Sequence, residues 1–352
     1  MDQPTRVSFW IVAAALAVVG WLHLGTPLLV ALFSLFVLDR LRPLRSRWLA
    51  VAAFLLLLVA ASYVIGHFVA QAVVALPAVA AKAIPSIIDY AEILGFELPF
   101  TDWASLKQVT LDAAREQATY LAGFATVATR ELVFVLVGIA VAVGLYLNPT
   151  LDIDRDVHPL RNNFYSHACE AVTERFRRFY ESFRAVMGAQ ILISAINTVL
   201  TSIFVFAVGL PNAAVVIGVT FLCGLVPVVG NLVSNTVITA IAFTVSPRMA
   251  LLALVFLVVI HKLEYFLNGK IIGDRIRNPV WLTLLALLLG EKLMGIPGMI
   301  LAPVVLHYVR AEGLRVPVER DDRRVAATPV EVVLAAPGTA GSEPPPLSRV
   351  AG

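Results

Sequence analysis

Long apolar segments with few charged residues most constrain what this chain can fold into. Residues 48–76, 187–209 and 249–267 each reach the length of about 20 residues that a helix needs to cross a bilayer, and 132–148 lies at the lower edge of that length. Of the 352 residues, 59% are hydrophobic and only 14% are charged, which is more apolar surface than a soluble core can bury. The sequence therefore predicts a membrane protein that crosses the bilayer several times.

Other apolar segments are shorter and come in pairs around glycine and proline. The early pair is 8–24 and 28–39, and the later pairs are 212–225 with 231–245 and 279–290 with 296–309. A helix of about 12–15 residues is about 18–23 Å long, which is less than a hydrocarbon core of about 30 Å. Each later pair is therefore either two ordinary spans with ends set too short or a helical hairpin that enters and leaves the membrane by the same face.

The expected fold is an all-α polytopic membrane protein with long spanning helices, short Gly/Pro-broken helical hairpins and amphipathic helices outside the bilayer. Apolar positions at helical spacing predict the amphipathic helices in 77–130 and 150–186. The expected parts, in chain order, are a short helix pair with a basic loop (1–47), a long span with external helices and a return span (48–149), a cytoplasmic amphipathic helix (150–186), a transport core with two broken hairpins (187–311) and a disordered cytoplasmic tail (312–352).

Arginine-rich loops predict the orientation. Arg40, Arg42, Arg45 and Arg47 crowd one short loop, and further basic clusters lie in 155–184, 270–277 and 310–324. The positive-inside rule places these loops and both termini in the cytoplasm of a cell with the chain in its inner (plasma) membrane. Segment 212–245 then starts and ends outside, and 279–309 starts and ends inside. Opposed broken hairpins of this kind are a recurring way to build a transport site.

The motifs of several enzyme classes are absent from the sequence. It has no Walker loop, no HExxH and no GxSxG motif, its six histidines lack ligand spacing, and its two cysteines are isolated. We therefore expect no enzyme activity, no cofactor, no metal site and no nucleic-acid partner. The expected partners are the lipid bilayer and a small solute or ion.

A polar stripe runs along one face of segment 187–209. Gln190, Ser194, Asn197 and Thr201 are spaced by four, three and four residues, and Asn231, Asn235 and Thr239 form a shorter stripe. Such stripes are costly against lipid. They either make hydrogen bonds between helices or line a permeation path, and the spacing leaves both interpretations open.

Ionisable residues near the ends of apolar segments pose a similar choice. Glu291 and Lys292 fall at the break between 279–290 and 296–309, and they lie at membrane depth only if that hairpin is re-entrant. His261, Lys262 and Glu264 end a span, either as a solvated helix cap or as a gate or ion-coupling site. For Glu174, Arg175, Arg178 and Glu181 the spacing predicts ion pairs on a solvated helix face.

An ordered set of residues in the C-terminal half resembles the autoinducer-2 exporter (AI-2E) family. The set is the G-x-x-P-x-x-G run of residues 224–230, followed by Glu264, Gly273, Pro279, Gly290, Gly295, Gly298 and Pro303. The order of the elements agrees along most of 8–310. Two departures are Asn231, where relatives often carry proline, and Asn268-Gly269, where a proline is expected.

The resemblance implies a secondary transporter that works without ATP and forms homo-oligomers. Family substrates are heterogeneous, from small signalling molecules to sodium or protons. Two hairpin tips are then the candidate moving parts of the substrate or ion path: Pro227, Gly230 and Asn231 on one, and Glu291, Lys292, Gly295 and Gly298 on the other. A passive channel and a non-transporting membrane scaffold remain the alternatives.

Overall fold

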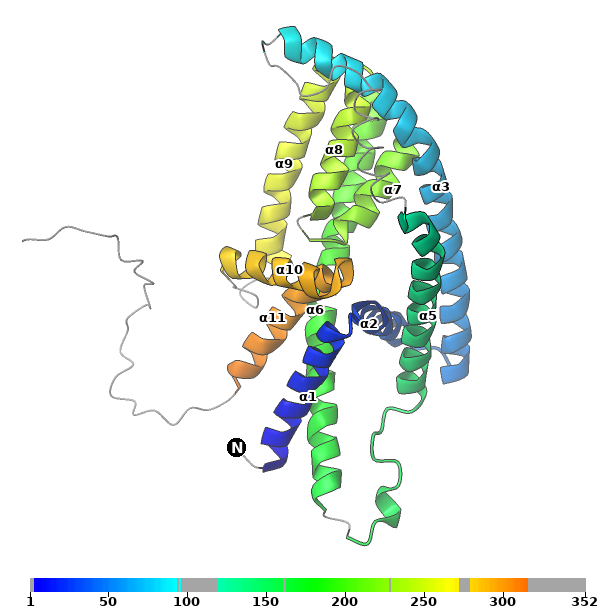
Figure 1. Ribbon diagram of the computed structural model, residues 1–352, viewed down its shortest axis with the longest axis vertical. Helices are drawn as coiled ribbons and strands as arrows, with labels where there is room; N and C mark the ends of the chain where they lie inside the picture. The colour runs from blue at the N-terminus through cyan, green and yellow to red at the C-terminus, as the bar shows by residue number, and fades with distance from the viewer. Residues whose placement is uncertain are drawn as a thin grey trace, which may run out of the picture. The chain divides into compact units, whose positions relative to one another are not determined.

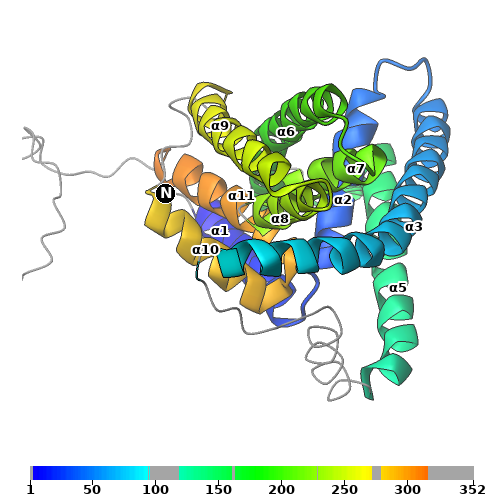
Figure 2. The same cartoon turned by 90° about the horizontal axis from the view of Figure 1, so that it is seen from above.

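Every regular element that the structure describes is helical. The computed structural model describes residues 3–93, 95, 119–160, 163–227, 229–271 and 279–315. Residues 1–313 group together by their contacts, and the helices below belong to that unit. The helices of Figures 1 and 2 thus confirm the prediction of an all-α chain. The predicted tail lies outside the described residues from 316 onward.

The early short pair and the first two long spans are present. α1 (Gln3–Trp21) and α2 (Gly25–Arg40) form the pair, and α3 (Arg47–Ile93) and α5 (Thr119–Leu147) contain the spans. α3 continues without a break through two prolines, so the first amphipathic segment expected after residue 76 extends the span directly. Its location outside the bilayer stays a prediction, and residues 96–118 lie outside the described part. α3 packs along α7 and α8 (Figure 2).

α6 joins two segments that the sequence separated. It is one helix of 45 residues, Phe164–Val208, and combines most of the amphipathic segment 150–186 with the span 187–209. By length and composition, α3, residues 129–147 of α5, and α6 can each cross a membrane. Gly209, with a φ of 67°, ends α6 in the left-handed conformation that favours glycine.

Side chains of the preceding loop fix the start of α6. The Asn163 side chain accepts a hydrogen bond from the Ser166 amide at 2.8 Å, as a helix cap. The Asp152 carboxylate accepts from the Ser166 hydroxyl at 2.7 Å and lies 2.8 Å from the His158 ring, and these contacts lower the pKa of Asp152. Because the charged carboxylate makes both contacts, this attachment is present above the ordinary pKa and is lost as the pH falls through the lowered value.

Two short helix pairs follow α6, as the sequence predicted. The first is α7 (Ala213–Gly224) with α8 (Val229–Phe243). After α9 (Pro247–Ile271), the second is α10 (Val280–Met294) with α11 (Ile296–Gly313). The break in the second pair differs from the prediction: α10 continues through residues 290–292 and stops only at Gly295, whose φ is 63°. Whether either pair is re-entrant stays a prediction.

α10 and α11 touch through their backbones. A Cβ atom added to Gly298 would lie 1.9 Å from the carbonyl oxygen of Gly290, and one added to Gly290 would lie 2.4 Å from that of Gly298. No side chain can therefore be accommodated between the helices at this point. Small residues allow such close approach where helices pack in membranes.

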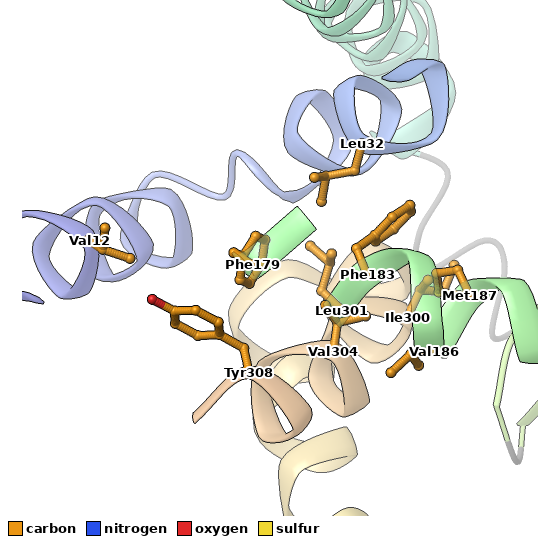
Figure 3. Packing of buried hydrophobic residues seen from close by; sticks show 10 residues of the cluster. All are labelled: Val12, Leu32, Phe179, Phe183, Val186, Met187, Ile300, Leu301, Val304 and Tyr308. Atoms are coloured by element: carbon orange, nitrogen blue, oxygen red, sulfur yellow. The ribbon is translucent and has the colours of Figure 1, made fainter. Parts of the chain in front are cut away.

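Two apolar clusters lie along different parts of α6. In the first, Phe179, Phe183 and Met187 of α6 meet α1, α2 and α11 (Figure 3). Phe179 packs edge-to-face on Tyr308, with ring centroids 5.4 Å apart. In the second, Val205 of α6 meets residues of α3, α7, α8 and α9. α6 is thus the element that both clusters share.

A buried ion cluster lies beside the first apolar cluster. Arg175 of α6 pairs with Glu312 of α11, and Arg178 lies 3.3 Å from the same carboxylate. Arg175 also donates to the Ser8 hydroxyl of α1 at 3.4 Å and lies over the Phe9 ring. The predicted pair of Glu174 with Arg178 is present at 2.9 Å, whereas Glu181 pairs with Arg177 on the exposed face. The prediction of a solvated face was wrong for Arg175, which is 7% exposed because residues of α1 and α11 cover it.

Candidate functional site

The polar stripe of α6 faces other helices, as its spacing required. Ser194, Asn197 and Thr201 are buried, and Gln190 is half-buried. Because membrane helices that expose such groups to lipid are disfavoured, contact with neighbouring helices is the expected outcome. The four residues then divide into two pairs with different surroundings.

Gln190 and Ser194 hold the last turn of α7. The Gln190 amide donates to the Gly224 carbonyl at 2.6 Å, and the Ser194 hydroxyl donates to the Phe221 carbonyl at 2.8 Å. The last carbonyls of a helix have no partner within the helix. These two side chains therefore satisfy the backbone at the point where the α7–α8 hairpin turns, which is the interhelical hydrogen bonding considered from the sequence.

Replacement of Gln190 with leucine is expected to lower stability by about 1 kcal/mol, because the Gly224 carbonyl loses a hydrogen bond from another helix. Thermal unfolding of the detergent-solubilised protein measures this loss. Thr198→Val on the same helix is the control, since the Thr198 hydroxyl bonds only to the Ser194 carbonyl one turn earlier. Equal effects of the two changes would contradict a specific role of Gln190 in holding α7.

Asn197 meets a carboxylate. Its Nδ2 donates to Glu264 Oε2 of α9 at 3.2 Å. Asn231, in the first turn of α8, donates from Nδ2 to both Glu264 oxygens at 2.9 Å. α6 and α8 thus each place one carboxamide on the half-buried carboxylate of α9. Glu264 is held between helices rather than solvated as a helix cap, and a role as a gate or ion-coupling site stays a prediction.

A cavity of about 20 Å³ opens beside this carboxylate. Its lining residues come from α6, α7, α8 and α9, and they are Asn197, Thr201, Thr220, Gly224, Asn231, Ser234, Asn235, Ile238, Leu257, Ile260, His261 and Glu264. Five of the predicted path residues meet here: Asn197, Thr201, Asn231, Asn235 and Glu264. Thr220 and Ser234 were not predicted. Thr220 is alone in the apolar run 213–222, whereas Ser234 lies three residues after Asn231, so helical spacing could have added it to that stripe.

The other predicted path residues lie elsewhere. Pro227 lies in the turn between α7 and α8, and Gly230 lies in the first turn of α8; neither lines the cavity. Glu291 and Lys292 lie in the last turn of α10, where their charged atoms are 3.8 Å apart and both side chains are substantially exposed. Gly295 ends α10, and Gly298 lies in the first turn of α11, against Gly290. The structure therefore does not bring the two hairpin tips into one site.

The match to known proteins extends over nearly all of these helices. The sequence profile described as "AI-2E family transporter" matches residues 7–311. This chain belongs to the AI-2E transporter family. The matched region contains the cavity, the Glu264 site and both hairpins, so the resemblance seen in residues 224–230 and after is confirmed. AI-2E membership also agrees with a transport protein rather than an enzyme.

A second comparison is more local. Within this AI-2E chain, 134 residues are 29% identical to a Bacillus subtilis (strain 168) protein named "Putative transport protein YdbI". The alignment covers 38% of this chain and 38% of that relative, so it spans little more than a third of either length. No solved structure matches the chain.

Proposed function

We propose that this AI-2E family member is a secondary permease of the inner (plasma) membrane that exports a small polar solute, with coupling to H⁺ or Na⁺. The observation that carries the proposal is the Glu264 carboxylate, held by Asn197 and Asn231 beside a polar cavity among apolar helices. Ionisable groups in such surroundings are costly and mark substrate or ion pathways.

Two hairpins are the proposed moving parts. α7–α8 carries Asn231 and half of the cavity lining, while α10–α11 turns at Gly295. Broken helices near the centre of a membrane provide binding groups in many secondary transporters. In the proposed orientation both termini are cytoplasmic, the hairpins approach from opposite faces, and copies of the chain associate as a homo-oligomer.

Export is tested by comparing cells that express the wild type, Asn231→Leu or an empty vector. After growth on a ¹³C-labelled carbon source, mass spectrometry measures the ratio of medium to cytoplasmic amounts for small polar metabolites. We expect this ratio to rise several-fold for at least one solute with the wild type. Asn231→Leu should return it to the vector level, because Glu264 loses two hydrogen bonds.

Thr236→Val on the same helix is the matched control, because the Thr236 hydroxyl is exposed and bonds only to the Leu232 carbonyl. Equal membrane levels of the three proteins are checked by immunoblot. The proposal fails if no solute responds to the wild type, or if Asn231→Leu exports as well as Thr236→Val. Release that continues unchanged after collapse of the H⁺ and Na⁺ gradients would indicate a passive channel instead.

A further inference from the structure

Two of the carboxylates that are held between helices, Glu312 and Glu264, have opposite electrostatic partners. Glu312 lies between two arginines, Arg175 and Arg178. Glu264 is held only by neutral carboxamides, and no arginine or lysine in the described part of the chain forms an ion pair with it. A carboxylate among apolar helices is stabilised by a compensating positive charge. Among the described residues, Glu312 has such charges in Arg175 and Arg178, whereas Glu264 has none.

Asn197 adds an unused oxygen at the same place. The residue is 6% exposed and lines the cavity, and its Oδ1 has no hydrogen-bond partner. Buried carbonyl oxygens normally accept a bond. If the amide is turned over, Oδ1 instead faces the carboxylate, and two oxygens then converge. Both orientations therefore favour a positively charged or hydrogen-donating occupant.

The size of the cavity restricts that occupant. A volume of about 20 Å³ accommodates one particle the size of a water molecule, whereas organic ligands occupy pockets of about 300 Å³ or more. Buried Thr201 and Thr220 contribute hydroxyl oxygens to the wall. Hard cations prefer such carboxylate, carbonyl and hydroxyl oxygens. Of the lining residues, only His261 besides Glu264 can titrate.

We propose that Glu264, together with the Oδ1 atom of Asn197, binds one small monovalent cation, Na⁺. The bound cation neutralises the carboxylate while the hairpin α7–α8 carries Asn231 against it. Use of this cation to drive export rests on the proposed function, but its binding does not. The organic solute then binds outside this cavity.

Infrared difference spectroscopy on the full-length protein in lipid tests binding without any organic solute. The measurement exchanges Na⁺ for choline at constant ionic strength and constant pH. We expect Na⁺ to shift the carboxylate bands and Glu264→Gln to abolish that signal. Glu264→Asp should keep the signal, which separates loss of the carboxylate from failure to fold.

Two further variants test the roles of Asn197 and His261. Asn197→Leu should weaken cation affinity by about tenfold or more while keeping the carboxylate, since it removes one ligand oxygen. His261→Gln should leave the Glu264 signal intact. The proposal is overturned if Na⁺ gives no signal that depends on Glu264, or if His261→Gln abolishes that signal. Such a result alongside Asn231-dependent solute release would leave export standing and remove only the cation site.

Discussion

Replacement of Gly230 with alanine is expected to destabilise the protein by more than about 3 kcal/mol and to abolish export. A Cβ atom at this position would lie 1.7 Å from the carbonyl oxygen of Cys223, at the point where α8 begins beside the end of α7. Both atoms are fixed by the backbone, so no rotamer change relieves the clash. Size-exclusion chromatography and thermal unfolding in detergent measure the loss of folded protein.

Gly188→Ala is the matched control for this change. Gly188 lies within α6, and an added Cβ atom meets nothing within 4 Å. Because glycine inside a helix costs roughly 0.5–1 kcal/mol relative to alanine, this variant should be as stable as the wild type or slightly more so. If Gly230→Ala were as stable as Gly188→Ala, the close contact between the backbones of α7 and α8 at Gly230 would be contradicted.

Truncation of Glu312 to alanine is expected to cost about 3–5 kcal/mol, because it leaves the buried Arg175 guanidinium without a counter-charge. The side chains of Arg175 and Glu312 are 9% and 7% exposed. Arg178 keeps its exposed partner Glu174, 2.9 Å away, and suffers less. A lower midpoint in thermal unfolding and a smaller monodisperse fraction are the expected observations.

Glu181→Ala provides the comparison, since its pair with Arg177 lies on the surface with both side chains more than half exposed. Surface pairs contribute about 0–1 kcal/mol. The double change Arg175→Met with Glu312→Leu should recover part of the loss, because no charge then remains unpaired. A Glu312→Ala variant as stable as Glu181→Ala would show that the buried pair does not hold α6 to α11.

Spacing along a helix predicted which side chains share a face. An α-helix has 3.6 residues per turn, so the spacing of Gln190, Ser194, Asn197 and Thr201 places them on one face. Because polar groups are disfavoured against lipid, that face was expected to meet other helices. The Gly and Pro breaks predicted both short helix pairs, because these residues interrupt helices through local backbone preferences. The end of α10 was set too early because Gly290 reads as a stop, whereas it lies in a continuous helix against Gly298.

Spacing within one helix cannot predict which side chains of distant helices will be in contact. Nothing in the local pattern indicates that Glu264 of α9 lies against Asn197 and Asn231, which are 67 and 33 residues away. Arg175 was assigned to a solvated face because its neighbours in sequence are charged, yet its partner Glu312 is 137 residues away. Tertiary packing decides both cases, and it also separates the carboxylate with a permanent counter-charge from the one without.

The two apolar clusters along α6 complete at different moments of synthesis. Apart from Val79, the buried members of the second cluster lie between Val205 and Leu257, so their helices can meet as soon as α9 has emerged. The first cluster joins Val12 and Leu32 to residues as late as Tyr308. Contacts of such separation form late. The N-terminal helices can pack on α5 and α6 earlier, but the part of the first cluster that α11 covers stays open until α11 has left the ribosome. A chain truncated before α11 would never cover that part.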